Sequence, residues 1–355
     1  MNPTRFGVRI PCAGPLASPS AMKTTSQLAE ELGFDSIWVH DYIVWTRALD
    51  NVHISCGSRE AVEAAGPERP PMFYESITNL AYIAAATSTI KLGVGVLVLP
   101  YREPIATAKQ LANVDALSDG RLILGVGQGA AKSTLNEDFE VLGVARRDKV
   151  PRTRDYLSAM LAIWREDEET VSWKGDYVSF ENATIFPKPV QQPHPPIWIG
   201  GQAEKSLEMI ADFADGWLSF WVSPEQFPAA IADVHRRLEI RGRDPKPFEV
   251  GTEIQIYLAD TTAQARKDAL PTVKAFEEGY AGTTGGFAEE GTEADPLDEI
   301  WNSSLIGSPD DVSARIQEFV DAGCNFFELK FIYRDLVHLE EQWRAFATDV
   351  MPRFN

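Results

Sequence analysis

The clearest concentration of reactive side chains is the run His40-Asp41-Tyr42, which directly follows the apolar segment 35–39. Branched and aromatic residues dominate that segment and predict a strand. If the strand continued to Tyr42, His40 and Tyr42 would share one face and Asp41 would lie on the other. An imidazole can transfer protons near neutral pH, whereas a phenol with an ordinary pKa of about 10 donates well but is a poor base. Tyr42 and His40 are therefore candidate catalytic residues. The alternative is a structural His40, bonded to Asp41 or to another neighbour.

A second candidate feature is Gly200-Gly201-Gln202-Ala203, which lies between a strand-like run and a helix predicted to end near Ala214. The first N–H groups of a helix have no partner within the helix, and the helix dipole places partial positive charge there. Glycine lets the backbone approach a ligand closely. The four residues therefore predict a cradle for a phosphate group. The alternative is a plain turn between a strand and a helix.

The elements that position these residues follow a regular order. Short apolar runs rich in β-branched residues alternate with longer amphipathic stretches, which is typical of a parallel sheet covered by helices. We predict one α/β domain over residues 1–355, a (β/α)8 TIM barrel, although a doubly wound sheet would alternate in the same way. The eight predicted strands are 6–10, 35–39, 90–99, 122–126, 196–199, 217–220, 248–258 and 325–332. Predicted helices include 20–32 and 73–87, and Pro104 and Pro151 are each expected to open another.

Three insertions interrupt this alternation. A long loop spans 40–72, a Gly-rich acidic stretch spans 279–298, and both are expected to act as lids. The segment 171–189 contains Lys174-Gly175-Asp176 between two alternating runs, which predicts a small hairpin after the fourth helix.

The composition argues against several classes of function. Among 355 residues, 33 Lys and Arg face 52 Asp and Glu, a net charge of −19, so we expect no nucleic-acid partner. No apolar run approaches the roughly 18 residues of a membrane span, and no signal peptide is visible. Three dispersed cysteines, with no CxxC, HExxH or GxSxG motif, indicate neither a metal site nor serine chemistry. We therefore expect a soluble, cytoplasmic protein that binds no metal and does not associate with membranes.

Four segments together carry a family resemblance. They are GFDSIWV at 33–39, GVGVLVLPYR at 93–102, DGRLILGVG at 119–127 and PPIWIGG at 195–201. Each is a weak motif alone, but in this order and spacing the chain resembles the bacterial-luciferase-like monooxygenase family. The resemblance covers essentially the whole chain and is strongest from residue 90 to residue 216. It implies a TIM-barrel oxidoreductase that uses flavin mononucleotide (FMN) or the deazaflavin F420.

The resemblance also implies roles for individual residues. The turn Gly200-Gly201-Gln202-Ala203 would hold the cofactor phosphate, although relatives often have hydroxyl residues where this chain has Gln202 and Ala203. A non-proline cis peptide is implied near Val96-Leu97, behind the flavin ring. The remaining cofactor-binding residues implied are Asp41, Gln128, Gly129 and Tyr156. Relatives usually have a histidine directly after the acid, where this chain has Tyr42, so that histidine is not carried over.

Aromatic and charged residues follow several predicted strand ends, where they would line a substrate pocket. The candidate substrate-binding residues are Trp45, His53, Phe220, Trp221 and Arg334.

We expect a monooxygenase that uses reduced FMN and O2 to oxygenate a small organic substrate. A partner flavin reductase would supply the reduced FMN, since no dinucleotide fingerprint follows the first strand. The alternative is an F420-dependent oxidoreductase that transfers hydride without oxygen, although the longer F420 tail requires a basic path that a charge of −19 makes difficult. A non-catalytic flavin-binding protein is a third reading. The resemblance further implies a homo-oligomer, most often a dimer.

Overall fold

Eight parallel strands close into a barrel. The computed structural model describes residues 3–44, 72–129, 137–167, 169–280 and 296–354. Hydrogen bonds join the strands in the order β1-β2-β3-β4-β7-β8-β9-β11, and β11 pairs again with β1. The predicted TIM barrel is therefore confirmed. The strands are β1 (Arg5–Arg9), β2 (Ser36–Val39), β3 (Lys91–Val98), β4 (Leu122–Gly127), β7 (Ile197–Gly200), β8 (Gly216–Phe220), β9 (Glu249–Leu258) and β11 (Phe326–Phe331).

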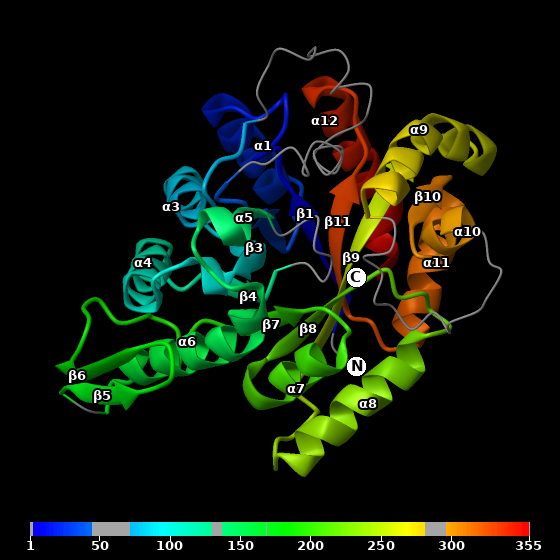
Figure 1. Ribbon diagram of the computed structural model, residues 1–355. Helices are drawn as coiled ribbons and strands as arrows, with labels where there is room; N and C mark the ends of the chain where they lie inside the picture. The colour runs from blue at the N-terminus through cyan, green and yellow to red at the C-terminus, as the bar shows by residue number, and fades with distance from the viewer. Residues whose placement is uncertain (1–2, 45–71, 130–136, 168, 281–295, 355) are drawn as a thin grey trace.

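Helices surround the strands, as Figure 1 shows. They are α1 (Pro19–Glu31), α3 (Ser76–Ala86), α4 (Pro104–Leu117), α5 (Glu137–Val141), α6 (Lys149–Trp164), α7 (Glu204–Phe213), α8 (Phe227–Ile240), α9 (Thr262–Tyr280), α10 (Pro296–Asn302), α11 (Pro309–Asp321) and α12 (Leu336–Ala345). Pro104 begins α4 as expected, whereas α6 begins at Lys149, two residues before Pro151. The helix predicted to begin at Phe73 begins at Ser76.

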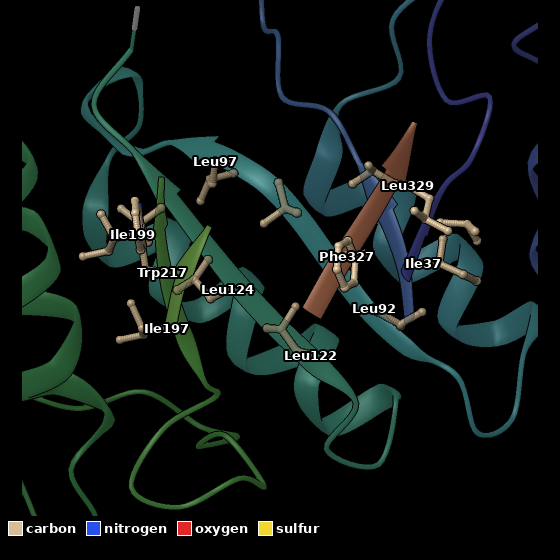
Figure 2. Packing of buried hydrophobic residues seen from close by; sticks show 14 of the residues in the cluster. Ile37, Leu92, Leu97, Leu122, Leu124, Ile197, Ile199, Trp217, Phe327 and Leu329 are labelled. Carbon is tan, nitrogen blue, oxygen red and sulfur yellow. The ribbon is translucent and has the colours of Figure 1, made fainter. Parts of the chain in front are cut away.

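The barrel has two apolar layers. Outward-facing residues such as Leu124, Ile199 and Leu329 pack between the strands and the helices (Figure 2). Inside the barrel, Trp38, Trp198 and Phe326 pack against one another, with ring centroids 4.9–6.0 Å apart. These bulky rings fill the part of the interior toward the amino-terminal ends of the strands. Polar side chains from the strands are therefore left to the carboxyl-terminal end, where the active sites of such barrels lie.

The predicted hairpin is present after α6, the fourth of the large barrel helices. It consists of β5 (Val171–Lys174) and β6 (Ser179–Ala183), which pair antiparallel. Asp155 of α6 accepts hydrogen bonds from the Trp173 indole and from the backbone N–H groups of Tyr177 and Val178. One partly buried carboxylate thus ties the hairpin to the helix before it.

The sequence patterns did not predict β10 (Leu305–Gly307) or α10. Strand β10 pairs only with the far end of β9, outside the closed barrel, and its three residues are too few to show periodicity. Trp45 and His53 lie outside the described residues, as do most of the two expected lids. No helix in the described part of the chain is long and apolar enough to cross a membrane.

Glu30 at the end of α1 fixes the start of β3. Its carboxylate accepts hydrogen bonds from the backbone N–H groups of Ser88, Thr89 and Ile90. Partial burial opposes ionisation, but these N–H groups outweigh it and lower the pKa of Glu30 to about 2. A carboxyl whose pKa is depressed on folding stabilises the protein above its unfolded pKa and loses that contribution as the pH falls through the folded value.

We therefore expect Glu30→Gln to destabilise the protein at pH 7 and to have progressively less effect as the pH falls from about 4.5 toward 2. Urea unfolding across that range measures the difference. Glu31→Gln is the matched control, because among the described residues the Glu31 carboxylate makes only an exposed ion pair with Arg344. A Glu30→Gln effect that did not change with pH would contradict the assignment.

Candidate active site

A buried cluster of charged side chains occupies the carboxyl-terminal part of the barrel interior. Arg9, at the end of β1, donates from Nε to Glu328 (2.7 Å) and from Nη2 to Glu253 (2.8 Å). Lys330 contacts the other oxygen of Glu253 at 2.9 Å, and its ammonium lies 4.7 Å from the ring centre of Phe276. The Glu328 side chain is fully buried, and the side chains of Arg9 and Lys330 are 6% and 5% exposed. Three strands, β1, β9 and β11, thus bring together charged groups that no single sequence segment contains.

The two carboxyl groups of this cluster are not equivalent. Burial raises the pKa of Glu328, Arg9 partly opposes that effect, and the negative charge of Glu253 adds to it. Burial would raise the pKa of Glu253 too, but the charges of Arg9 and Lys330 outweigh it and lower that pKa. Glu328 Oε2 has no hydrogen-bond partner among the described residues. The cluster therefore contains one carboxylate that stays ionised and one that gains a proton more readily.

Strand β3 bulges beside this cluster. Its register with β4 shifts between Val94 and Leu97, and the Gly95–Val96 peptide bond is cis. The bond lies one position before the Val96-Leu97 pair on which we expected it. Gly95 offers its carbonyl to Arg9 Nη2 at 3.3 Å, and a Cβ on Gly95 would lie 2.7 Å from Glu328 Oε2.

Of the two β3 residues predicted to contact the cofactor, only Val96 faces the barrel interior, where it packs against the cluster that contains Trp38 and Trp198. A Cβ on Gly127 would lie 2.5 Å from a methyl of Val96, and a Cβ on Gly200 would lie 3.3 Å from another. Gly127 of β4 therefore allows the two strands to pack closely at the β3 bulge. Leu97 is fully buried in the outer apolar layer (Figure 2), so its side chain is not available to the cofactor site.

The predicted phosphate cradle is built from three elements. Gly201 follows β7 with φ +104°, and its carbonyl accepts from the Trp217 indole at 2.9 Å. Helix α7 has Ala203 as N-cap, with no side-chain capping bond. Among the described residues, the N–H groups of Glu204 and Lys205 therefore have neither an intrahelical partner nor a side-chain cap, whereas the Ser206 N–H donates to the Ala203 carbonyl at 2.7 Å. Gln128, after β4, donates to the Ser206 hydroxyl at 3.2 Å, so an amide and a hydroxyl lie beside this turn.

Ser206 is a residue that sequence reasoning missed. The resemblance pointed to a hydroxyl directly after the glycines, where this chain has Gln202 and Ala203. The first turn of α7 instead brings Ser206 beside Gly201, since a Cβ on Gly201 would lie 2.9 Å from Ser206 Oγ. The Gln202 side chain, predicted to bind the cofactor, instead donates to the carbonyl of Phe220.

Asp41 holds the end of β3. Its carboxylate forms a two-oxygen pair with Arg102 at 2.7 Å each and accepts from Ser76 Oγ and from the backbone N–H of Val98. The carboxylate is fully engaged within the protein. Asp41 therefore shapes the cofactor-facing bulge through β3, which argues against direct ligation of the cofactor by its side chain.

His40 and Asp41 do point to different surroundings, because His40 Nδ1 contacts Arg9 at 3.0 Å. Its partner is thus a neighbour from β1 and not Asp41. Strand β2 ends at Val39, so the alternation argument does not extend to Tyr42. The Tyr42 ring packs edge-on against Phe73 at 5.2 Å.

The remaining predicted site residues lie on α6, at the end of β8, after β4 and after β11. Tyr156 is buried on α6 beside the Arg152 guanidinium, and burial raises the pKa of its hydroxyl. Phe220, the last residue of β8, stacks on Trp221 with ring centroids 4.6 Å apart, and Trp221 has φ +54°. Gly129 follows Gln128 with φ +83°. Arg334 is exposed and lines a recess near the ends of β9 and β11, together with Tyr257, Asp268, Pro271, Thr272, Ile332 and Tyr333.

The described residues fit a cofactor that combines a planar ring with a phosphate group. The α7 amino terminus and the Ser206 hydroxyl supply donors for an anion. Gly201 leaves space that a side chain would fill. Behind the β3 bulge, the charged cluster provides a polar wall on the side of the barrel interior.

Comparison with known proteins agrees with this geometry. The family model described as luciferase-like monooxygenase matches residues 3–325. The chain is 26% identical over 298 residues to an FMNH2-dependent dimethylsulfone monooxygenase of Pseudomonas putida, covering 79% of this chain and 78% of that protein. It is equally 26% identical over 321 residues to a 5,10-methylenetetrahydromethanopterin reductase of Methanolobus tindarius, covering 84% and 86%.

Among solved structures, an F420-dependent secondary alcohol dehydrogenase superposes with a TM-score of 0.75 at 18% identity, covering 99% of both chains. Such a likeness concerns the fold. The family match spans most of the chain and includes all four segments that carried the resemblance. The protein belongs to the luciferase-like monooxygenase family of oxidoreductases.

Proposed function

We propose that this protein is a monooxygenase that uses reduced FMN and O2 to oxygenate a small organic substrate, with a separate flavin reductase as the source of reduced FMN. The observation that carries the proposal is the pairing of the Gly201–Ser206 phosphate cradle with the β3 bulge at Gly95–Val96. The cradle would accommodate a phosphate, and the bulge would accommodate the face of a ring. The FMN-dependent relative of similar length supports the same choice.

The charges around the cradle favour FMN over F420. The nearest guanidinium groups on α8 are already paired, Arg237 with Glu204, Glu208 and Asp233, and Arg241 with Glu208 and Asp212. A glutamate-bearing F420 tail adds carboxylates that need free cations. The single phosphate of FMN can be held by the helix terminus alone.

When bound, reduced FMN supplies the electrons that activate O2. The chain's own residues have other tasks. Val96 and Gly129 would contact the ring, Gln128 and Ser206 would hold the phosphate, and His40 and Tyr42 would donate hydrogen bonds near the reacting atoms. The hydrophobic rings of Phe220 and Trp221 exclude water from the substrate side. Arg334, at the recess beyond β11, orients a polar or anionic group of the substrate.

F420-dependent hydride transfer is the second candidate function. It is favoured by the relative from Methanolobus tindarius, which matches at the same identity and over slightly more of the chain.

Ser206→Ala tests the phosphate cradle. It is expected to weaken FMN binding by about tenfold, since a hydrogen bond to a charged group contributes at least about 1.5 kcal/mol. Riboflavin has the same ring without the phosphate, so its affinity should not change. Flavin fluorescence titration of both ligands against wild type and variant measures the difference. An equal loss for both flavins would place Ser206 outside the phosphate site.

The reaction class is tested by oxygen balance. Reduced FMN is supplied by a flavin reductase, and oxygen uptake and hydrogen peroxide release are recorded with a panel of small organic compounds. A substrate should lower the peroxide released per oxygen consumed and yield a product that contains one atom from ¹⁸O₂. If peroxide matched oxygen uptake for every compound while reduced F420 was oxidised anaerobically, hydride transfer would replace the proposal.

A further inference from the structure

The contact between Arg9 and His40 determines which imidazole nitrogen carries hydrogen. Arg9 Nη1 lies 3.0 Å from His40 Nδ1. A guanidinium can only donate hydrogen bonds, so Nδ1 must be the acceptor and cannot carry hydrogen. In a neutral imidazole the hydrogen is then on Nε2.

Arg9 cannot readily turn away from this contact. Glu328 holds its Nε, Glu253 holds its Nη2, and the Gly95 carbonyl accepts from the same Nη2. The Arg9 side chain is only 6% exposed. The Arg9 guanidinium, which is the donor to His40, is therefore held in place by groups from β11, β9 and β3.

We propose that Arg9, anchored by Glu328 and Glu253, is a positioning residue that keeps His40 neutral with its hydrogen on Nε2. His40 then serves the site as a hydrogen-bond donor and not as a general base. The use of that donor in oxygenation rests on the proposed function, whereas the tautomer does not.

The surroundings of His40 agree with this assignment. Its backbone N–H donates to Cys12 Sγ on the segment after β1, at 3.4 Å. Arg9 and Lys330 are the cations that act on it, and Glu328 and Glu253 are bound to those cations. Burial lowers the pKa of His40 well below its ordinary value, and the two positive charges lower it further. Protonation of Nδ1 would also place a hydrogen against a guanidinium donor.

The test is ¹⁵N NMR of the cofactor-free, full-length protein labelled at histidine, between about pH 5 and pH 8. The chain has five histidines, and His40→Gln assigns the His40 signals by their loss. We expect an unprotonated Nδ1 and a protonated Nε2 for His40 at every pH. Arg9→Gln should move the His40 titration upward into this range and mix the two tautomers, whereas Arg344→Gln, an exposed arginine on α12, should change neither.

A wild-type His40 that titrated near its ordinary value, or carried hydrogen on Nδ1, would overturn the proposal. The wild-type spectrum decides the tautomer even if Arg9→Gln folds poorly. An unchanged His40 spectrum in a folded Arg9→Gln variant would remove Arg9 as the cause. Because no flavin is present, failure here is distinguishable from failure to bind FMN.

Discussion

Arg9→Met is expected to lower the free energy of unfolding by about 3–5 kcal/mol, as when one partner of a buried ion pair is removed. Glu328 would be left fully buried with a carboxylate that has lost its cation and already has one unpartnered oxygen. Glu253 would keep Lys330. Urea unfolding at pH 7 measures the loss. Arg344→Met is the control and should change stability by less than about 1 kcal/mol, because its ion pairs are exposed.

Two further measurements attribute the loss to Glu328. Its pKa is raised even with Arg9 present, so without Arg9 it should accept a proton more readily, and the Arg9→Met penalty should shrink as the pH falls. The double variant Arg9→Met, Glu328→Gln should recover part of the stability, since the uncompensated charge is gone. If Arg9→Met behaved like Arg344→Met, the cluster would not be a buried, coupled unit.

Gly201→Ala is expected to weaken FMN binding by about 10–100-fold. A non-glycine residue at φ +104° costs roughly 1–3 kcal/mol, and the added Cβ would lie 2.9 Å from Ser206 Oγ. The turn must either keep its strained geometry or shift away from the phosphate. Binding is measured by flavin fluorescence titration, with circular dichroism to confirm that the variant is folded.

Gly242→Ala is the matched control. Gly242 also has positive φ, +70°, but it follows α8 and no heavy atom lies within 4 Å of its added Cβ. It should lower stability without changing FMN affinity. If the two variants bound FMN equally well, the turn after β7 would not be the phosphate site.

The barrel was predictable because its signals are local. Strand-like runs, glycines and the order of four motifs were visible in the chain, and the closed sheet of eight parallel strands follows them closely. The turn at Gly200-Gly201 was also predictable, because a helix start after a strand needs no distant partner to be recognised. By contrast, β10 has three residues and depends on pairing with β9.

The charged cluster was missed for a physical reason. Its charged residues are dispersed among apolar strands, with Arg9 in β1, Glu253 in β9, and Glu328 and Lys330 in β11. They come together only when the barrel closes. A signal was present in Glu328 and Lys330, since residues two apart in a fully buried strand share a face. For Tyr42 the alternation argument required β2 to continue beyond Val39, where the strand ends, and its catalytic role stays a prediction.

The most direct test of the central claim is anaerobic titration of the purified protein, separately, with reduced FMN and with F420, followed by fluorescence. The proposed function predicts tight binding of reduced FMN that weakens in Ser206→Ala, and weak binding of F420. Tight binding of F420 with weak binding of reduced FMN would contradict it and would identify the protein as a hydride-transferring member of its family.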